Sequence, residues 1–326
     1  MSHIIPNIIL PNGAKMPIIG LGTYQAEDEE AVATINIALE CGYRHIDTAT
    51  LYQNEAAIGR ALSEWIASGK GKREDLFVTT KLPQIGNRAS DVEQCLDKSL
   101  ARLQLNYVDL YLIHNPVGLK GKNDNDVWPV DSDGNSVLDL DTDLESLYKA
   151  MENQVDHGKT KAIGISNFNS KQIERIMKTC RIKPANHQIE IHVYHQQKPI
   201  REVCEKYGIS LCGYSPIAAP YMTKSSSDMP ILLEHPTVNA IANRLNRTSA
   251  QILIRFLVQQ GIPTIPKSAN PERIAQNIDV FDFELTSSDM SSLEALDQGG
   301  KGRVFHFQDI FKGISRHPEW TFHSPY

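Results

Sequence analysis

The stretch GYRHIDTATLYQNE, residues 42–55, contains a short apolar run that ends in Asp47 and continues into a polar loop with Tyr52. Two later stretches, FVTTKLP and YLIHNP, have the same form and end their apolar runs near Lys81 and at His114. In a barrel of parallel strands, ionisable residues at the C-terminal ends of the strands are typical of a catalytic face. We therefore predict that these four side chains meet at one end of such a barrel.

Strand-like and helix-like stretches alternate along the whole chain. Residues 29–42, EEAVATINIALECG, are typical of the helices, because apolar residues recur at helical spacing and a glycine stands at the end. Eight strand–helix pairs follow one another without a break in composition. The strand-like members are residues 18–24, 45–49, 76–82, 108–115, 160–168, 186–192, 209–217 and 262–267. We assign residues 249–261 and 287–297 to extra helices outside the eight pairs.

Eight strand–helix pairs predict an α/β protein, a (β/α)₈ TIM barrel in which residues 1–326 form one domain. The Asn12-Gly13 dipeptide predicts a β-hairpin ahead of the barrel. The alternative is an open doubly wound sheet, but that fold normally has a G-x-G-x-x-G turn after its first strand, and this chain reads GLGTY there. Long segments typical of loops that shape a binding site are residues 115–141, 218–234 and the C-terminal loop 299–326.

The composition excludes several classes of function. A net charge of −6 gives no basic surface for nucleic acid or anionic membranes. No apolar span approaches the ~18 residues of a membrane helix, and the N-terminus has no signal-peptide pattern, so we expect a soluble, cytoplasmic protein. The cysteines are odd in number and scattered, as is typical of free thiols in a reducing compartment: Cys41, Cys95, Cys180, Cys204 and Cys212.

The four ionisable residues suit the reduction of a carbonyl group, whose oxygen gains charge when a hydride reaches the carbon and must then be protonated. Tyr52 can donate this proton if a neighbouring ammonium, such as that of Lys81, lowers its pKa from the usual value near 10. Asp47 can hold Lys81 as an ion pair, and His114 can orient the carbonyl and stabilise the oxyanion. Each residue alone has an ordinary structural explanation, such as a helix cap or a surface lysine. Their recurrence at strand ends favours a common site.

Residues 265–277, IPKSANPERIAQN, predict an anion site on an otherwise acidic protein. Lys267 and Ser268 leave the last strand, and Arg273 lies near the start of the following helix, whose N-terminus attracts anions. The loops after the last two strands of such a barrel are a frequent phosphate site. The alternative is a helix that merely begins with basic residues. This alternative is weaker, because the helix dipole disfavours cations at the N-terminus.

Two other patterns carry less weight. Tyr194 and Lys198 match the Y-x-x-x-K pattern of short-chain dehydrogenases, but a proline follows and a strand-like run precedes them, which places them at a strand end rather than on a helix. His187, His192 and His195 have neither helical spacing nor a known zinc spacing. We therefore predict no metal site.

Together these segments resemble the aldo-keto reductase superfamily, in its aldose reductase-like branch, over nearly the whole chain. The similarity is greatest to invertebrate members, insect ones included. The resemblance implies that Tyr52 is the general acid, that Lys81 and Asp47 are its partners, and that His114 orients the substrate. The C-terminal tail is similar to the substrate loop of monomeric reductases, so we expect a monomer.

The resemblance also implies NADPH/NADP⁺ as cofactor, with residues 265–277 as the site for the adenosine 2′-phosphate and adenine. GISNFN, NHQIE and GYSP match the segments that hold the nicotinamide in the family. The implied cofactor contacts are Thr23, Ser166, Asn167, Gln188, Tyr214, Ser215, Lys267, Ser268, Arg273 and Asn277. One departure is Tyr221, which stands where many relatives have an acid that closes a belt over the cofactor through a salt link to Lys267.

The substrate pocket also departs from aldose reductase. Tyr24, Pro83 and Asn115 stand where that enzyme has tryptophans, whereas Trp128 keeps an aromatic ring in the first long loop. These exchanges leave room, and apolar residues of the tail offer a wall for a large ligand, unless the tail fills the vacated volume. The tail residues are Phe305, Phe307, Ile310 and Phe311.

The sequence thus predicts an NADPH-dependent reductase of aldehydes and ketones, with Tyr52 as general acid and a small-molecule carbonyl as its partner. A broad range of carbonyl substrates is expected, including bulky ones such as 3-dehydroecdysteroids. Sugars and lipid aldehydes are further options. The alternative is a non-catalytic or weakly catalytic NADPH-binding barrel that serves as a regulatory subunit of an ion channel or as a structural protein. Turnover of an aromatic aldehyde with NADPH distinguishes the two.

Overall fold

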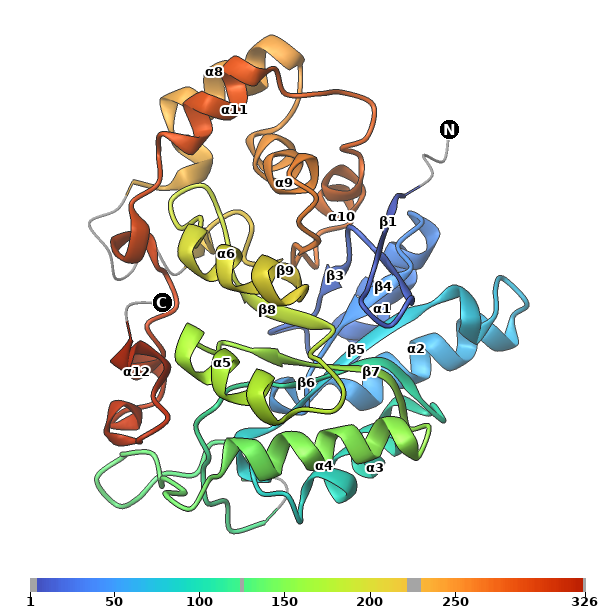
Figure 1. The fold of residues 1–326 in the computed structure, drawn as a ribbon. Coiled ribbons are helices and arrows are strands. Elements are labelled where there is room, and N and C mark those ends of the chain that lie inside the picture. Colours follow the sequence, from blue (N-terminus) through green and yellow to red (C-terminus); the bar gives the residue numbers. More distant parts are fainter. Residues whose placement is uncertain (1–4, 124–125, 222–229, 325–326) are drawn as a thin grey trace.

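The computed structural model describes residues 5–123, 126–221 and 230–324. Eight parallel strands form one sheet in the order of the sequence, and the helices that connect them lie outside it (Figure 1). The strands are β3 (Leu21–Gly22), β4 (His45–Asp47), β5 (Phe77–Leu82), β6 (Val108–Ile113), β7 (Thr160–Ser166), β8 (Asn186–Glu190), β9 (Ser210–Tyr214) and β10 (Thr264–Ile265).

The sheet closes between its first and last strands. Ile19 pairs in parallel with Thr264, and Gly22 pairs with Lys267. A Cβ atom on Gly22 would lie 2.7 Å from the carbonyl oxygen of Ile265, so this close approach of two strands requires glycine. The predicted (β/α)₈ barrel is confirmed.

The predicted N-terminal hairpin is also present. It consists of β1 (Asn7–Ile9) and β2 (Lys15–Pro17), which pair antiparallel. The turn contains Gly13 at a φ of +85°, a conformation that glycine adopts without strain. Leu10 and Met16 are buried against side chains from the barrel strands and form a small core with them. The hairpin therefore covers the N-terminal end of the barrel and leaves the C-terminal end for the site.

Eight helices cover the outside of the barrel and bury the main apolar core against its strands. They are α1 (Asp28–Glu40), α2 (Glu55–Ala67), α3 (Val92–Leu103), α4 (Leu144–Asp156), α5 (Ser170–Thr179), α6 (Lys198–Tyr207), α9 (Ser249–Gln259) and α10 (Pro271–Ile278).

The structure corrects the assignment of the seventh helix. The sequence analysis assigned residues 249–261 to an extra helix outside the eight pairs, but these residues form α9, the helix that contacts β10 and α10. The outer helices are α8 (Pro236–Leu245) and α11 (Ser287–Glu294), which contact each other (Figure 1). The reason is that α9 is apolar around most of its circumference, with Leu253 and Phe256 fully buried, and must be covered on both sides.

Two long segments cross the C-terminal end of the barrel. Residues 115–141 follow β6, and the tail meets them where the backbone N–H of Ser136 donates to the oxygen of Lys312 at 2.8 Å. Further along, Asn169 Nδ2 donates to the backbone oxygen of Thr321 at 2.8 Å. Of the third long segment, residues 222–229 lie outside the described part of the chain. In the ranges that are described, none of the helices has the length and apolar character of a membrane span.

Candidate active site

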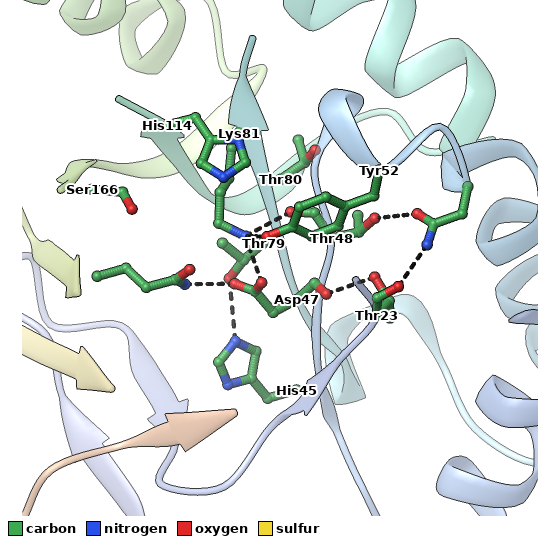
Figure 2. Close-up of polar contacts among 12 residues, drawn as sticks. Thr23, His45, Asp47, Thr48, Tyr52, Thr79, Thr80, Lys81, His114 and Ser166 are labelled. Carbon is green, nitrogen blue, oxygen red and sulfur yellow. Dashed lines mark hydrogen bonds and ion pairs between the residues drawn. The ribbon is translucent and has the colours of Figure 1, made fainter. Parts of the chain in front are cut away.

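A buried ion pair lies at the C-terminal end of the barrel. Lys81 Nζ donates to Asp47 Oδ1 at 2.5 Å and to the backbone oxygen of Thr48 at 3.0 Å. The same nitrogen lies 3.4 Å from Tyr52 Oη. The two charged side chains are 0% and 2% exposed. Figure 2 shows that Asp47, Tyr52, Lys81 and His114, which come from different parts of the chain, point toward one another.

The electrostatic environment keeps Tyr52 protonated. Burial raises the pKa of Tyr52, and the Lys81 ammonium, which lowers it, offsets only part of that rise. Burial alone would lower the pKa of Lys81, but Asp47 and Tyr52 hold it above its usual value. The expected influence of Lys81 is therefore present but is outweighed by burial. At neutral pH the site contains a phenol that can donate a proton and an ammonium beside it.

His114 follows β6 and faces the phenol. Its ring centroid lies 5.6 Å from that of Tyr52, with an angle of 78° between the planes. Burial, and secondarily the Lys81 ammonium, place the pKa of His114 well below its usual value. Its Nδ1 atom has no hydrogen-bond partner among the described residues. A neutral imidazole in this position can donate or accept a hydrogen bond without adding charge.

A second group of polar side chains fixes the backbone around the ion pair. Thr23 Oγ1 donates to the backbone oxygen of Asp47 at 2.9 Å, and Asn54 Nδ2 donates to the backbone oxygen of Thr23 at 2.8 Å. Thr48 Oγ1 donates to Asn54 Oδ1 at 2.8 Å. Sequence reasoning missed Thr48 and Asn54. An asparagine before a helix is typical of an N-cap, but Asn54 makes no such bond to α2.

The residues expected to hold a nicotinamide lie beside the ion pair. Gln188 Nε2 donates to the second oxygen of Asp47, Oδ2, at 2.6 Å. Asn167 Nδ2 donates to Ser166 Oγ at 3.1 Å and to the backbone oxygen of His114 at 2.9 Å. Asn167 adopts a φ of +61°, an uncommon left-handed conformation that asparagine tolerates better than most residues. Side-chain amides thus link the end of β7 to the end of β6, and β8 to β4.

A cavity of about 680 Å³ lies over these residues, within the usual range for small-molecule sites. Most of the residues singled out from the sequence line it: Thr23, Tyr24, Asp47, Tyr52, His114, Trp128, Ser166, Asn167, Gln188, Tyr214, Ser215, Lys267, Ser268, Arg273, Phe305 and Phe307. Of the residues expected to act in catalysis or to contact cofactor or substrate, four are not part of its lining: Lys81, Pro83, Asn115 and Asn277. Lys81 is fully buried and contacts Asp47 and Tyr52, which do line the cavity.

The other three residues have structural surroundings of their own. Asn115 Oδ1 accepts a hydrogen bond from the backbone N–H of Val117 at 3.1 Å, and its backbone oxygen accepts from Asn87 Nδ2 at 2.8 Å. Pro83 is buried at the end of β5, and Asn277 is 5% exposed on α10. Their expected contacts with substrate or cofactor stay predictions.

The wall of the cavity that faces the tail is largely aromatic. Trp128 stacks on Phe311 with centroids 4.4 Å apart and planes at 14°. Phe305 meets the ring of Tyr214 edge-on, with centroids 5.6 Å apart. Sequence reasoning missed further lining residues, which lie after β3, after β4 and after β9 and mostly have short or apolar side chains that carry no distinctive signal. These residues include Gln25, Leu51, Pro216, Ile217, Ala219 and Pro220.

The residues of the expected anion site lie along the same cavity. Lys267 and Arg273 are exposed side chains, and Ser268 is buried between them along the chain. The side chain of Asn270 caps α10 by accepting from the backbone N–H of Arg273 at 3.0 Å. Cations beside a capped helix N-terminus are suited to a phosphate group. Tyr221, which is 52% exposed, also lines the cavity, and burial raises its pKa to about 12, so it offers Lys267 no negative charge at neutral pH.

The two weaker sequence patterns have structural explanations. Tyr194 lies in the loop between β8 and α6, whereas Lys198 begins α6, so the pair does not share a helix face. His187 Nε2 accepts from the backbone N–H of Phe168 at 3.1 Å, and His195 Nδ1 donates to the oxygen of Gly299 at 2.8 Å. In the described part of the chain, no group of three or more His, Cys, Asp and Glu residues is arranged to hold a metal ion.

The barrel and its strand-end site are matched by known proteins. Residues 18–298 match the Aldo/keto reductase family. "Aldo-keto reductase family 1 member A1" of Gallus gallus is 42% identical over 323 residues, and that of Homo sapiens 41% over 323, each alignment covering 98% of both chains. The solved structure of the aldose reductase from Schistosoma japonicum superposes with a TM-score of 0.89 at 39% identity, covering 99% of this chain and 100% of that one.

The fold and the comparisons define an oxidoreductase built on a TIM barrel. The chain belongs to the aldo/keto reductase family, as predicted from its sequence. Membership of this family supports the reduction of carbonyl groups.

Proposed function

We propose that this protein reduces aldehydes and ketones to alcohols with NADPH, and that Tyr52 is the general acid. The observation that carries this proposal is the position of Lys81 Nζ, 2.5 Å from Asp47 Oδ1 and 3.4 Å from Tyr52 Oη, beneath a cavity that the phenol lines. A proton donor, a fixed ammonium and a neutral imidazole at one point match what a carbonyl oxygen requires as it gains charge.

The chain's own residues account for the fate of the proton. Tyr52 donates its hydroxyl proton to the carbonyl oxygen, and the resulting phenolate is stabilised by the Lys81 ammonium. Asp47 holds that ammonium in place and compensates its burial, since an unpaired buried ammonium would be costly. His114, neutral because of burial, orients the carbonyl by a hydrogen bond. When bound, the cofactor supplies the hydride to the carbonyl carbon.

The residues present fit a dinucleotide with an extra phosphate. Lys267 and Arg273 provide exposed positive charge at the helix N-terminus, where the adenosine 2′-phosphate would bind. At the other end of the cavity, Ser166, Asn167 and Gln188 offer the hydroxyl and amide groups that a carboxamide needs, and Tyr214 offers a ring for stacking. Thr23, Ser215, Ser268 and Asn277 are proposed as further contacts.

The aromatic wall favours apolar carbonyl compounds, bulky ones included. Trp128, Phe305, Phe307 and Phe311 line the cavity, whose volume of about 680 Å³ is shared by cofactor and substrate. Ketosteroids such as 3-dehydroecdysteroids and long-chain aldehydes are of suitable size. We further propose that the protein works as a cytoplasmic monomer, which sedimentation at about its chain mass of 36.5 kDa would support.

The decisive experiment is turnover of a generic aromatic aldehyde, followed by oxidation of NADPH. Reduction to the alcohol at an ordinary enzymatic rate supports the proposal. Tight NADPH binding without turnover would instead support the alternative, a cofactor-binding barrel with a regulatory or structural role.

A further inference from the structure

Glu190, the last residue of β8, is a buried carboxylate outside the group that performs the chemistry, and it is 3% exposed. Its Oε1 atom accepts from the backbone N–H of Val304 at 2.7 Å and pairs with His192 Nε2 at 2.9 Å. Its Oε2 atom accepts from the backbone N–H of Phe305 at 3.0 Å. Since an ionised carboxylate only accepts, His192 Nε2 is the protonated nitrogen.

The charge of Glu190 depends on the C-terminal tail. Burial alone would raise the pKa of Glu190, but the bond from His192 and the backbone N–H of Val304 hold it below its usual value. A buried carboxylate is costly unless its oxygens are hydrogen-bonded. Two of its three donors belong to the tail, so detaching residues 304 and 305 would leave this charge largely unsatisfied. Docking of the tail and burial of the charge are therefore coupled.

Close backbone contacts seat the same part of the tail on the loop after β8. The backbone N–H of Gln298 donates to the oxygen of Tyr194 at 2.8 Å. A Cβ atom on Gly302 would lie 1.9 Å from that same oxygen, so any side chain at residue 302 must displace the tail. His195 Nδ1 adds a bond to the oxygen of Gly299 at 2.8 Å.

The docked segment places Phe305 in the cavity wall. Phe305 is 8% exposed and meets the ring of Tyr214 edge-on at 5.6 Å. The rest of the wall is attached elsewhere, because Phe311 stacks on Trp128 and the backbone oxygen of Lys312 accepts from Ser136. Phe305 and Phe311 are thus held by separate contacts, and Glu190 is the centre of the contacts that hold Phe305.

We propose that Glu190 is a positioning residue for the substrate site: by fixing Val304 and Phe305 it holds the Phe305 ring as a rigid wall and sets the preference for bulky apolar carbonyl compounds over small ones. This inference rests on the proposed carbonyl reductase function and deepens it, since nothing in the proton transfer requires Glu190. A rigid wall retains packing contacts with a large substrate that a mobile wall loses.

Glu190→Gln tests the proposal. One oxygen of the carboxylate becomes an NH₂ group, so at least one of the three donors now faces another donor, while the volume is nearly unchanged. We expect the ratio of kcat/KM for a bulky apolar ketone to that for glyceraldehyde to fall about tenfold, mainly through KM for the ketone.

Glu152→Gln is the matched control. Glu152 is 4% exposed, and its Oε1 atom accepts from the backbone N–H groups of Arg181 and Ile182 at 2.5 and 2.6 Å, far from the cavity. The Glu152→Gln substitution should lower the free energy of unfolding without changing the ratio of kcat/KM for the bulky ketone to that for glyceraldehyde. An equal change of the ratio in both variants, or no change in Glu190→Gln, overturns the proposal.

Gly302→Ala provides a second, independent displacement of the tail that leaves Glu190 intact, and the same fall in the substrate ratio is expected. Hydrogen exchange of peptides spanning residues 302–312 gives a readout without catalysis: exchange should accelerate in Glu190→Gln and Gly302→Ala but not in Glu152→Gln. If the wild-type protein reduced no carbonyl compound, the proposed function would fail, while faster exchange would still show the anchor. Unchanged exchange in both tail variants would refute the anchor itself.

Discussion

The hydroxyl of Tyr52 lies 3.4 Å from the Lys81 ammonium, whereas Asp47 takes the shorter bond to the same nitrogen at 2.5 Å. In the resting site the charge of Lys81 is therefore shared mainly with the carboxylate. A phenolate formed at Tyr52 would compete for that ammonium and draw it closer, because a charge-assisted bond is stronger than a bond to a neutral phenol. The resting site therefore holds a protonated phenol beside an ammonium that is paired with Asp47.

Replacing Tyr52 by phenylalanine should remove the proton donor and preserve the ring. We expect kcat for an aromatic aldehyde to fall by about 10²–10⁴, the usual contribution of a general acid, with little change in NADPH affinity. Steady-state kinetics and fluorescence titration of NADPH measure the two quantities. Tyr107→Phe is the control, since its hydroxyl has no partner among the described residues and lies away from the cavity. Near-normal kcat in Tyr52→Phe would rule out the tyrosine acid.

The two exposed cations at the start of α10 should select the cofactor. Charge-assisted bonds from Lys267 and Arg273 to a 2′-phosphate contribute roughly 1.5–3 kcal/mol each. Replacement of both by methionine should weaken NADPH by several orders of magnitude and leave NADH, which lacks the phosphate, nearly unaffected. Dissociation constants for both cofactors are the measurement, with the exposed Lys171→Met as control for lost charge. Equal losses for NADPH and NADH would show that these cations do not contact the extra phosphate.

The meeting of Asp47, Tyr52, Lys81 and His114 could be predicted because its signal is local: each lies in or just after an apolar run, and the barrel brings strand ends together. The hydrogen bonds that surround these residues could not be predicted from the sequence. Gln188 and Asp47 are 141 residues apart, and no local pattern indicates that one amide donates to that carboxylate. Asn54 is a second example. Its position before α2 predicts a helix cap, but its side-chain amide donates to the backbone oxygen of Thr23 instead.

The exchange of α8 and α9 has a related cause. Both segments have apolar residues at helical spacing, so periodicity alone predicts two helices without saying which one touches the strands. The difference lies in how much of the circumference is apolar. Ile252, Leu253 and Ile254 are consecutive and fully buried on α9, which is possible only for a helix covered by strands on one side and by α8 on another.

His187 should make stability depend on pH. Burial lowers the pKa of His187 to about 3, so this imidazole stays neutral in the folded protein at pH values where the unfolded chain, with a pKa of 6.5, is protonated. The unfolded state then binds more protons, and the free energy of unfolding falls as pH is lowered. Between pH 7 and pH 4 this group accounts for a loss of about 3 kcal/mol.

His187→Gln keeps an acceptor for the backbone N–H of Phe168 and removes the titration. Urea unfolding at pH 7 and pH 4 measures how much the free energy of unfolding falls between the two pH values. This fall should be smaller by about 3 kcal/mol in His187→Gln than in the wild type. His157→Gln, at a side chain that is 50% exposed, should leave the difference unchanged. The same pH dependence in His187→Gln and wild type would contradict a neutral, buried His187.

Trp128→Ala should selectively impair the reduction of bulky carbonyl compounds. The indole lines the cavity and stacks on Phe311 at 4.4 Å, so its removal takes away one wall and releases the ring behind it. A small aldehyde such as glyceraldehyde can react at Tyr52 without reaching this wall, whereas a ketosteroid or long-chain aldehyde must pack against it. We expect kcat/KM for the bulky substrates to fall about tenfold relative to glyceraldehyde, which corresponds to the loss of ~1.4 kcal/mol of apolar contact. Phe283→Ala is the control, because this ring packs under Arg247 and does not line the cavity. A uniform fall for all substrates, or a wild-type preference for the smallest aldehydes, would count against a pocket suited to large apolar ligands.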